Sequence, residues 1–115
     1  MVATDLATLF LDTSLRIKRF TPRLADLVNI TTADLGRPIT DFTHQLEYDG
    51  LEADIRRVLT ELAPVEREIR GRDGRWFMVR YRPYRTMEDK IDGVVVTFLD
   101  VTDRRRMEDE LRERE

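Results

Sequence analysis

The chain has 115 residues, enough for one domain with its own core and too few for two. It contains no cysteine, which excludes disulfides, thiolate catalysis and cysteine-bound metal. The formal net charge is -3 with acids and bases interspersed, so no nucleic-acid surface is indicated. There is no apolar run of membrane-spanning length and no signal peptide, so we expect a cytoplasmic domain with no membrane partner.

The first twenty residues predict a β-hairpin. Residues 7–11 form a short apolar run, 12–14 are turn formers, and 15–18 alternate apolar and basic side chains, as a half-buried strand does. A helix should follow, because Thr21 and Pro22 suit a helix cap and the first helical position. Two further short elements are expected, one running from Thr31 or Thr32 to Gly36 and one at residues 41–43.

The middle of the chain predicts the longest helix inside the domain. Residues 51–62 carry apolar side chains at helical spacing with charged residues between them, and Pro64 ends the pattern. The apolar positions are Leu51, Ile55, Val58, Leu59 and Leu62. This amphipathic pattern predicts a helix that lies on the core with one face and meets solvent with the other.

Three strands are expected after this helix. Residues 65–70 and 75–84 should pair across a turn that contains Asp-Gly, and residues 91–101 form a final strand. Pro83 lacks an N–H group and therefore predicts a bulge or an edge position. The final strand is apolar on both faces, which suits the centre of a sheet. This order of elements indicates an α+β domain with helices covering one face of the sheet.

The most informative stretch is Asp100-Val101-Thr102, where the last strand meets a charged, helix-forming tail. Thr102 is expected to cap this helix, because threonine hydroxyls accept hydrogen bonds from the first helical turn. We therefore predict one domain over residues 1–102 and the start of a helix over 103–115. A strand joined directly to an outgoing helix can pass a change in a sheet beyond the domain. Asp100 and Thr102 are thus the candidate signal-coupling residues.

The outgoing helix has an apolar stripe of two residues, Met107 and Leu111. Two such positions do not hold an isolated helix in water, since helices shorter than about 12–15 residues are marginal. The stripe indicates either a solvated tail or the first turns of a dimeric coiled coil. We favour the coiled coil, because the amphipathic pattern is still open at Glu115.

The order of elements and the closing triplet resemble the PAS sensor domain. Members of that family end their sheet with an Asp-aliphatic-Thr triplet that leads into a signalling helix, and Asp100-Val101-Thr102 matches it. The resemblance covers about residues 5–103. It is closest to PAS domains of bacterial proteins that fuse chemotaxis-type methylesterase and methyltransferase domains to a sensor histidine kinase. The stretches that carry this closer likeness are residues 15–22, 36–39, 64–68, 83–86 and 91–95.

The resemblance implies a five-stranded antiparallel sheet with short helices on one face and a C-terminal signalling helix. It also implies a sensory or signal-relay module of a larger bacterial two-component or chemotaxis-type protein. Its expected partners are a second copy of the chain, a downstream kinase domain in the same protein and, where a cavity exists, a small-molecule ligand. The alternative is a ligand-free homodimerisation module that only sets the spacing of the output helices. A pocket between helices and sheet would favour the first hypothesis, and a filled core the second.

The remaining polar residues form no catalytic or metal-binding pattern. His44 is the single histidine, so a catalytic triad or a histidine-rich metal site lacks parts. The helix at 51–62 lacks the histidine that haem-binding relatives use, and photosensing flavin relatives need a cysteine. Trp76 is expected to pack against a helix or a dimer interface, and Arg80 to pair with an acid on a neighbouring strand. We therefore expect no cofactor, no metal and no enzymatic activity in this domain.

Overall fold

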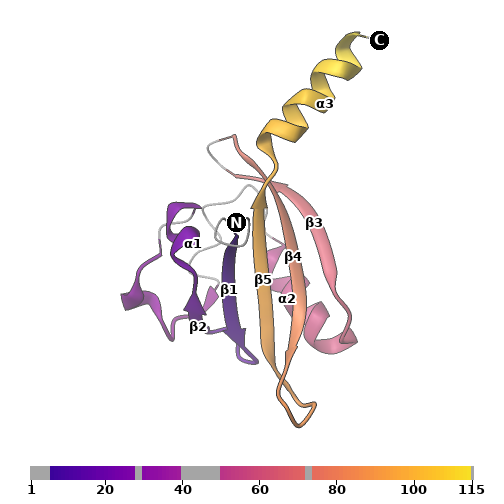
Figure 1. Cartoon of the computed structure of the whole chain (residues 1–115). Coiled ribbons are helices and arrows are strands. Elements are labelled where there is room, and N and C mark those ends of the chain that lie inside the picture. Colours follow the sequence, from indigo (N-terminus) through magenta and orange to yellow (C-terminus); the bar gives the residue numbers. More distant parts are fainter. Residues whose placement is uncertain (1–5, 28–29, 40–49, 72–73, 115) are drawn as a thin grey trace.

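One antiparallel sheet of five strands forms the centre of the molecule (Figure 1). The computed structural model describes residues 6–27, 30–39, 50–71 and 74–114. The spatial order of the strands is β2-β1-β5-β4-β3, so the last strand in sequence lies in the middle, as its apolar composition predicted. The strands are β1 (Ala7–Asp12), β2 (Ile17–Phe20), β3 (Val65–Arg70), β4 (Trp76–Arg85) and β5 (Ile91–Asp100).

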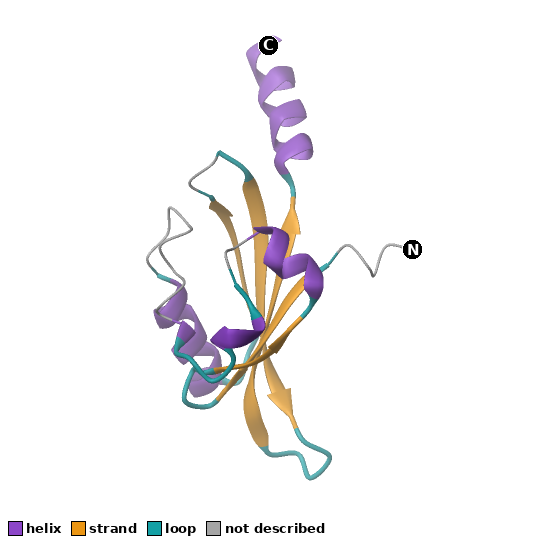
Figure 2. Cartoon of the chain, turned by 90° about the vertical axis from the view of Figure 1, so that its left-hand side faces the viewer, coloured by secondary structure: helices purple, strands orange, loops and turns teal. Residues whose placement is uncertain are grey.

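The helices divide into those that cover the sheet and one that leaves it. Helix α2 (Leu51–Glu61) packs on β4 and β5, and α1 (Pro22–Leu27) packs on β1. A 3-10 helix, η2 (Thr32–Asp34), follows α1. Figure 2 shows α2 on one side of the sheet, whereas α3 (Thr102–Arg114) continues from β5 and points away from the domain. The predicted α+β class, with helices on one face of a five-stranded sheet, is confirmed.

The core lies between α2 and the sheet. Alternate residues of β4 face α2 and are almost fully buried, namely Phe77, Val79 and Tyr81. Ile55 and Val58 of α2 pack against them. An ion pair also joins the helix to the sheet, since Arg67 of β3 donates to the carboxylate of Asp54 at 2.8 Å and the Asp54 side chain is only 5% exposed.

The first hairpin differs from the prediction, because its second strand begins at Ile17 and not at residue 15. The carboxylate of Asp12 accepts hydrogen bonds from the N–H groups of Ser14 and Arg16, at 2.9 and 3.0 Å. Leu15 adopts a left-handed conformation with φ of 64°. These local bonds extend the turn through Arg16, although the Leu15 side chain still reaches the core.

Helix α2 also ends one residue earlier than predicted. Leu62 has a left-handed φ of 56°, and its N–H donates to the Val58 carbonyl oxygen at 2.8 Å. This turn leaves the Leu62 side chain exposed, so Leu62 is not part of the apolar face. The prediction for Pro83 is confirmed, because β3 pairs with β4 only as far as Tyr81. The element expected at 41–43 lies outside the described residues.

Candidate functional site

The end of β5 and the start of α3 meet the first residue of β4. Val101 donates its N–H to the Trp76 carbonyl oxygen at 2.9 Å, and the Trp76 N–H donates to the Thr102 hydroxyl oxygen at 2.9 Å. The Thr102 hydroxyl in turn donates to Oδ1 of Asp100 at 2.6 Å. The same carboxylate oxygen accepts the Thr102 N–H at 2.9 Å. The buried side chain of Thr102 therefore joins β4, β5 and α3.

The prediction that Thr102 acts as the helix cap is wrong in its geometry. Helix α3 begins at Thr102, one residue before the predicted start, and the Arg105 N–H donates to the Val101 carbonyl oxygen at 2.9 Å. The Thr102 hydroxyl serves the sheet, because it accepts the Trp76 N–H. The side chain that accepts a helical N–H is that of Asp100. Both candidate coupling residues thus lie in one network, in which Asp100 and not Thr102 accepts the N–H of the first helical residue.

A second set of contacts links the first turn of α3 to β3 and β4. Glu68 of β3 accepts hydrogen bonds from Arg104, at 3.2 Å, and from Arg105. The Arg105 guanidinium also lies 4.1 Å from the centre of the Trp76 ring, within the range of a cation–π interaction. We call Glu68, Trp76, Arg104 and Arg105 the helix clamp. Glu68 and Arg105 are partly buried, so water weakens their attraction less than on an open surface.

The helix clamp was not predicted from the sequence. Nothing in the order of residues places Glu68 of β3 beside a helix that starts more than thirty positions later. Trp76 is half-buried, and its ring contacts Arg105. The one signal in the sequence is the alternation of β3, which places Glu66 and Glu68 on the same face of the strand, where they can meet basic side chains.

The other candidate residues have ordinary surroundings. Arg80 donates to Glu66 of the neighbouring strand at 2.7 Å, which confirms the predicted charge pairing. Met107 and Leu111 are 64% and 61% exposed on α3. His44 lies outside the described residues. Within the parts of the chain that the structure describes, no group of acidic or histidine side chains is arranged to hold a metal ion.

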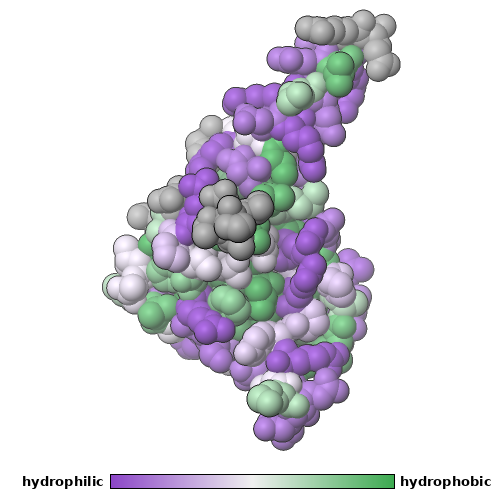
Figure 3. Space-filling model, in the orientation of Figure 1, coloured by the Kyte–Doolittle hydropathy of each residue, from purple (hydrophilic) through white to green (hydrophobic). Residues whose placement is uncertain are grey.

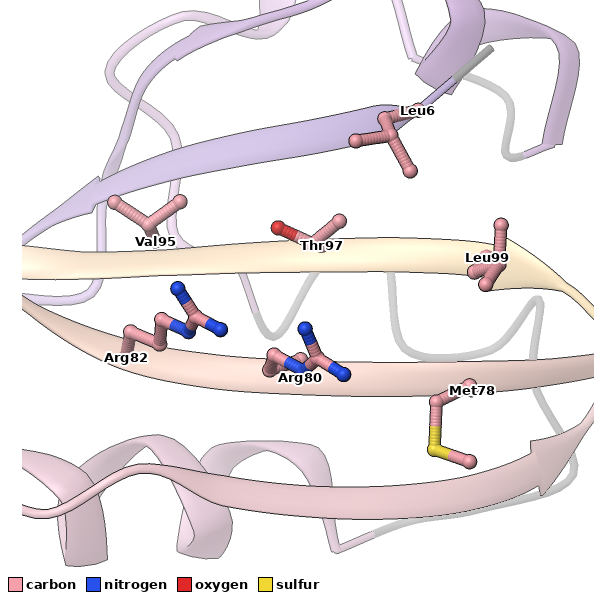
Figure 4. A pocket seen from close by; sticks show the side chains of 7 residues that line it. All are labelled: Leu6, Met78, Arg80, Arg82, Val95, Thr97 and Leu99. Atoms are coloured by element: carbon pink, nitrogen blue, oxygen red, sulfur yellow. The ribbon is translucent and has the colours of Figure 1, made fainter. Parts of the chain in front are cut away.

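The sheet face opposite α2, which we call the outer face, is hollowed. A pocket of about 390 Å³ lies on it between the start of β1 and strands β5 and β4 (Figure 4). Its lining is mostly apolar, and two arginines reach over it from β4. The lining residues are Leu6, Met78, Arg80, Arg82, Val95, Thr97 and Leu99. In the described residues, no helix has the length and apolar character needed to span a membrane.

A family model described as the PAS domain matches residues 1–102. An uncharacterised 104.1 kDa protein of Rhodobacter capsulatus, from the region 3′ of hypE, is 42% identical over 103 residues. The match covers 90% of this chain and 11% of that protein. The chain therefore spans about a tenth of the length of this relative.

Solved structures show the same fold. Histidine kinase ThkA in complex with the response regulator TrrA is 25% identical, with a TM-score of 0.81 over 94% of this chain and 33% of that one. An RNA-binding light-oxygen-voltage receptor is 21% identical, with a TM-score of 0.71 over 95% of this chain and 33% of that one. The domain of a putative light and redox sensing histidine kinase from Haloarcula marismortui is 18% identical, with a TM-score of 0.68 over 87% of this chain and 92% of that one. With the family model matched from the first residue to Thr102, this chain belongs to the PAS domain family.

Proposed function

We propose that this PAS domain senses or relays a signal inside a larger cytoplasmic signalling protein of the bacterial two-component or chemotaxis type. A ligand or partner would change the sheet or its helical cover, and the junction at Thr102 would pass the change to α3. Helix α3 would then act on a histidine kinase domain further along the same protein. Such relay needs two states of the domain to which the input binds with different affinity.

The observation that carries this proposal is the sharing of one hydroxyl group among three elements. The Thr102 side chain contacts the backbone of β4 and the carboxylate at the end of β5, while its own backbone is the first residue of α3. A shift of β4 against β5 therefore changes the start of α3 directly. The helix clamp adds a second link, from β3 to the same helical turn.

Two comparisons support the wider context. Histidine kinase ThkA, solved in complex with the response regulator TrrA, is similar to 94% of this chain. The Rhodobacter relative is long enough to hold several further domains, since the match covers 11% of it. The likeness to proteins with methylesterase and methyltransferase domains makes such a fusion the specific parent that we propose. PAS domains are generally non-catalytic, so we assign any enzymatic activity to other domains of that parent.

The alternative is a ligand-free homodimerisation module in which α3 only sets the spacing of the output helices. It predicts that nothing binds between the helices and the sheet. Native mass spectrometry of the purified chain separates the two hypotheses, because it reports bound small molecules and oligomeric state together.

The relay is tested by Thr102→Val in the full-length protein, with Thr102→Ser as the matched control. Valine keeps the shape and removes the hydroxyl, which leaves the Trp76 N–H without its acceptor at a cost of about 1–3 kcal/mol. A domain with about 5–15 kcal/mol of stability tolerates this loss. We expect kinase autophosphorylation to lose its response to the signal in Thr102→Val and to keep it in Thr102→Ser. An unchanged response in Thr102→Val would contradict the relay.

We also propose that the domain carries no haem or flavin. The reason is the missing helix histidine and the missing cysteine noted in the sequence. Protein purified from a host that supplies both cofactors should show no absorption band of either in the visible range. A stoichiometric haem or flavin band would overturn this prediction.

A further inference from the structure

We propose that the pocket on the outer face binds a small carboxylate with an apolar tail, and that Arg82 holds its carboxylate head. This site lies on the opposite side of the sheet from the space between the helices and the sheet. The inference goes beyond the proposed function, because it gives the chemical class of a ligand and the strands that the ligand contacts. It does not depend on the relay through Thr102, and its test measures binding without a kinase domain.

The pocket has the size and the composition of a small-molecule site. Its volume of about 390 Å³ lies in the range of roughly 300–1,000 Å³ that is typical of ligand pockets, which are mostly apolar with a few polar groups. In antiparallel sheets with one solvated face, the solvated positions are usually polar. Here Leu99 of the central strand is 45% exposed. Figure 3, in which the outer face is toward the viewer, shows hydrophobic atoms over the middle of the sheet. The surface of the hollow therefore favours a ligand with an apolar part.

The pocket changes from cationic to apolar along the strands. Three cross-strand pairs of β4 and β5 line it, and they are Arg82–Val95, Arg80–Thr97 and Met78–Leu99. Figure 4 shows both guanidinium groups and the Thr97 hydroxyl in one half of the pocket, with Leu6 and Leu99 in the other half. A ligand that matches this order has a negatively charged head and an apolar tail. Four residue steps along β5, from Val95 to Leu99, span roughly 13 Å, which is about the length of a medium-chain alkyl carboxylate.

One positive charge at the cationic end is not balanced. Nε of Arg80 lies 2.7 Å from the Glu66 carboxylate, which balances the charge of Arg80. Among the residues that the structure describes, no carboxylate lies within ion-pair distance of Arg82, whose side chain is exposed. A carboxylate brings one negative charge, and its two oxygens match the planar fork of an arginine. A phosphate monoester would bring roughly one and a half to two negative charges and leave part of them unpaired. The charges therefore favour a carboxylate head.

The strand register explains why Arg82 differs from Arg80. Glu66 of β3 stands directly opposite Arg80. The residue that precedes β3 on the side of Arg82 is Pro64, which carries no charge. On its other side, β4 pairs Arg82 with the apolar Val95. Within the described part of the chain, Arg82 is therefore the pocket cation that is left for an added anion, and a paired strand fixes its backbone.

The test titrates the 115-residue chain with decanoate, below the concentration at which decanoate forms micelles, and follows methyl NMR signals and the heat of binding. Decanol is the control for the charged head, and butyrate is the control for the tail. Arg82→Gln removes the unbalanced charge. Arg85→Gln is the matched control, because Arg85 lies on the same strand outside the pocket lining and pairs with Asp89. Thermal unfolding of each variant shows whether it folds.

We expect decanoate to shift the methyl signals of Val95 and Leu99, which line the pocket. The methyl signals of Val94 and Val96, which lie in the core, should stay unchanged. Decanol should bind at least about tenfold more weakly than decanoate, and Arg82→Gln should weaken decanoate binding by a similar factor. Butyrate should also bind more weakly, because it lacks most of the apolar surface. Arg85→Gln should leave the affinity unchanged.

Shifts at Val94 and Val96 without shifts at Val95 and Leu99 would place the ligand in the core and overturn the inference. Equal affinities for decanoate and decanol, equal losses in the two arginine variants, or no binding of decanoate would also overturn it. Signals of Val95 and Leu99 that change with protein concentration and not with decanoate would show another copy of the chain on this face, which contradicts a ligand site there. None of these outcomes bears on the relay, which the autophosphorylation of the Thr102 variants tests separately.

Discussion

At the residue scale, the Thr102 hydroxyl links β4 to the end of β5 at the first residue of α3. Its position between a strand and a charged helix predicted a coupling role, and the observed hydrogen bonds show which atoms meet there. It was not predictable that the Thr102 hydroxyl serves the sheet and that Asp100 accepts the first helical N–H, because this depends on the Trp76 N–H being within reach of Thr102. Strand pairing decides that distance, and the spacing of residues along the chain does not encode it.

The helix clamp has a natural reporter, because Trp76 is the one tryptophan of the chain. The Arg105 guanidinium covers its ring, and this contact contributes about 0.5–1 kcal/mol. Arg105→Ala should uncover the indole, shift its fluorescence emission to longer wavelength and increase its quenching by acrylamide. Arg106→Ala, at the exposed neighbouring position, is the control and should change neither. An emission spectrum unaffected by Arg105→Ala would show that the ring is not covered by α3 in solution.

At the scale of elements, alternation and turn chemistry predicted most of the sheet. The three strands after α2 have the predicted partners. In β4 and β5 the inward positions carry large apolar side chains at a strict spacing of two. The first hairpin was misplaced, since the Asp12 carboxylate competes with the strand ladder for the following N–H groups. The predicted end of α2 was one residue too late. Leu62 fits the apolar spacing of the helix, but it adopts a left-handed φ and turns the chain.

The pairing of β1 with β5 depends on a close approach at Gly93. A Cβ atom at Gly93 would overlap the carbonyl oxygen of Leu11 on the neighbouring strand. Gly93→Ala should therefore lower the free energy of unfolding by about 3 kcal/mol or more. Gly36→Ala is the comparison, because Gly36 also has a positive φ but has no atom within 4 Å of the added carbon. That variant should lose about 1–2 kcal/mol, from backbone strain alone. Urea unfolding measures the free energy of unfolding of both variants. Equal losses in the two would contradict the steric clash at Gly93.

At the scale of the whole molecule, the domain is a sheet with helices packed on one face, extended by a projecting helix (Figures 1 and 2). Its longest dimension is 52 Å against 31 and 30 Å for the others, and α3 accounts for the extension. The order of elements made this shape predictable, because a helix that follows the central strand has to leave at the end of the sheet. The direction in which α3 leaves the sheet was not predictable, since it depends on the contacts of its first turn with β3 and β4.

The central claim is that the Thr102 hydroxyl holds α3 to the sheet, and amide hydrogen exchange of the 115-residue chain tests it most directly. A helix of 13 residues is marginal in water without support. In Thr102→Val, we predict faster exchange of the Trp76 amide and of the α3 amides from Arg105 onward, with the β5 amides of Val94, Val96 and Phe98 still protected. Thr102→Ser should restore protection. If α3 stays as protected in Thr102→Val as in the natural chain, the hydroxyl does not couple the sheet to the helix, and the account is contradicted.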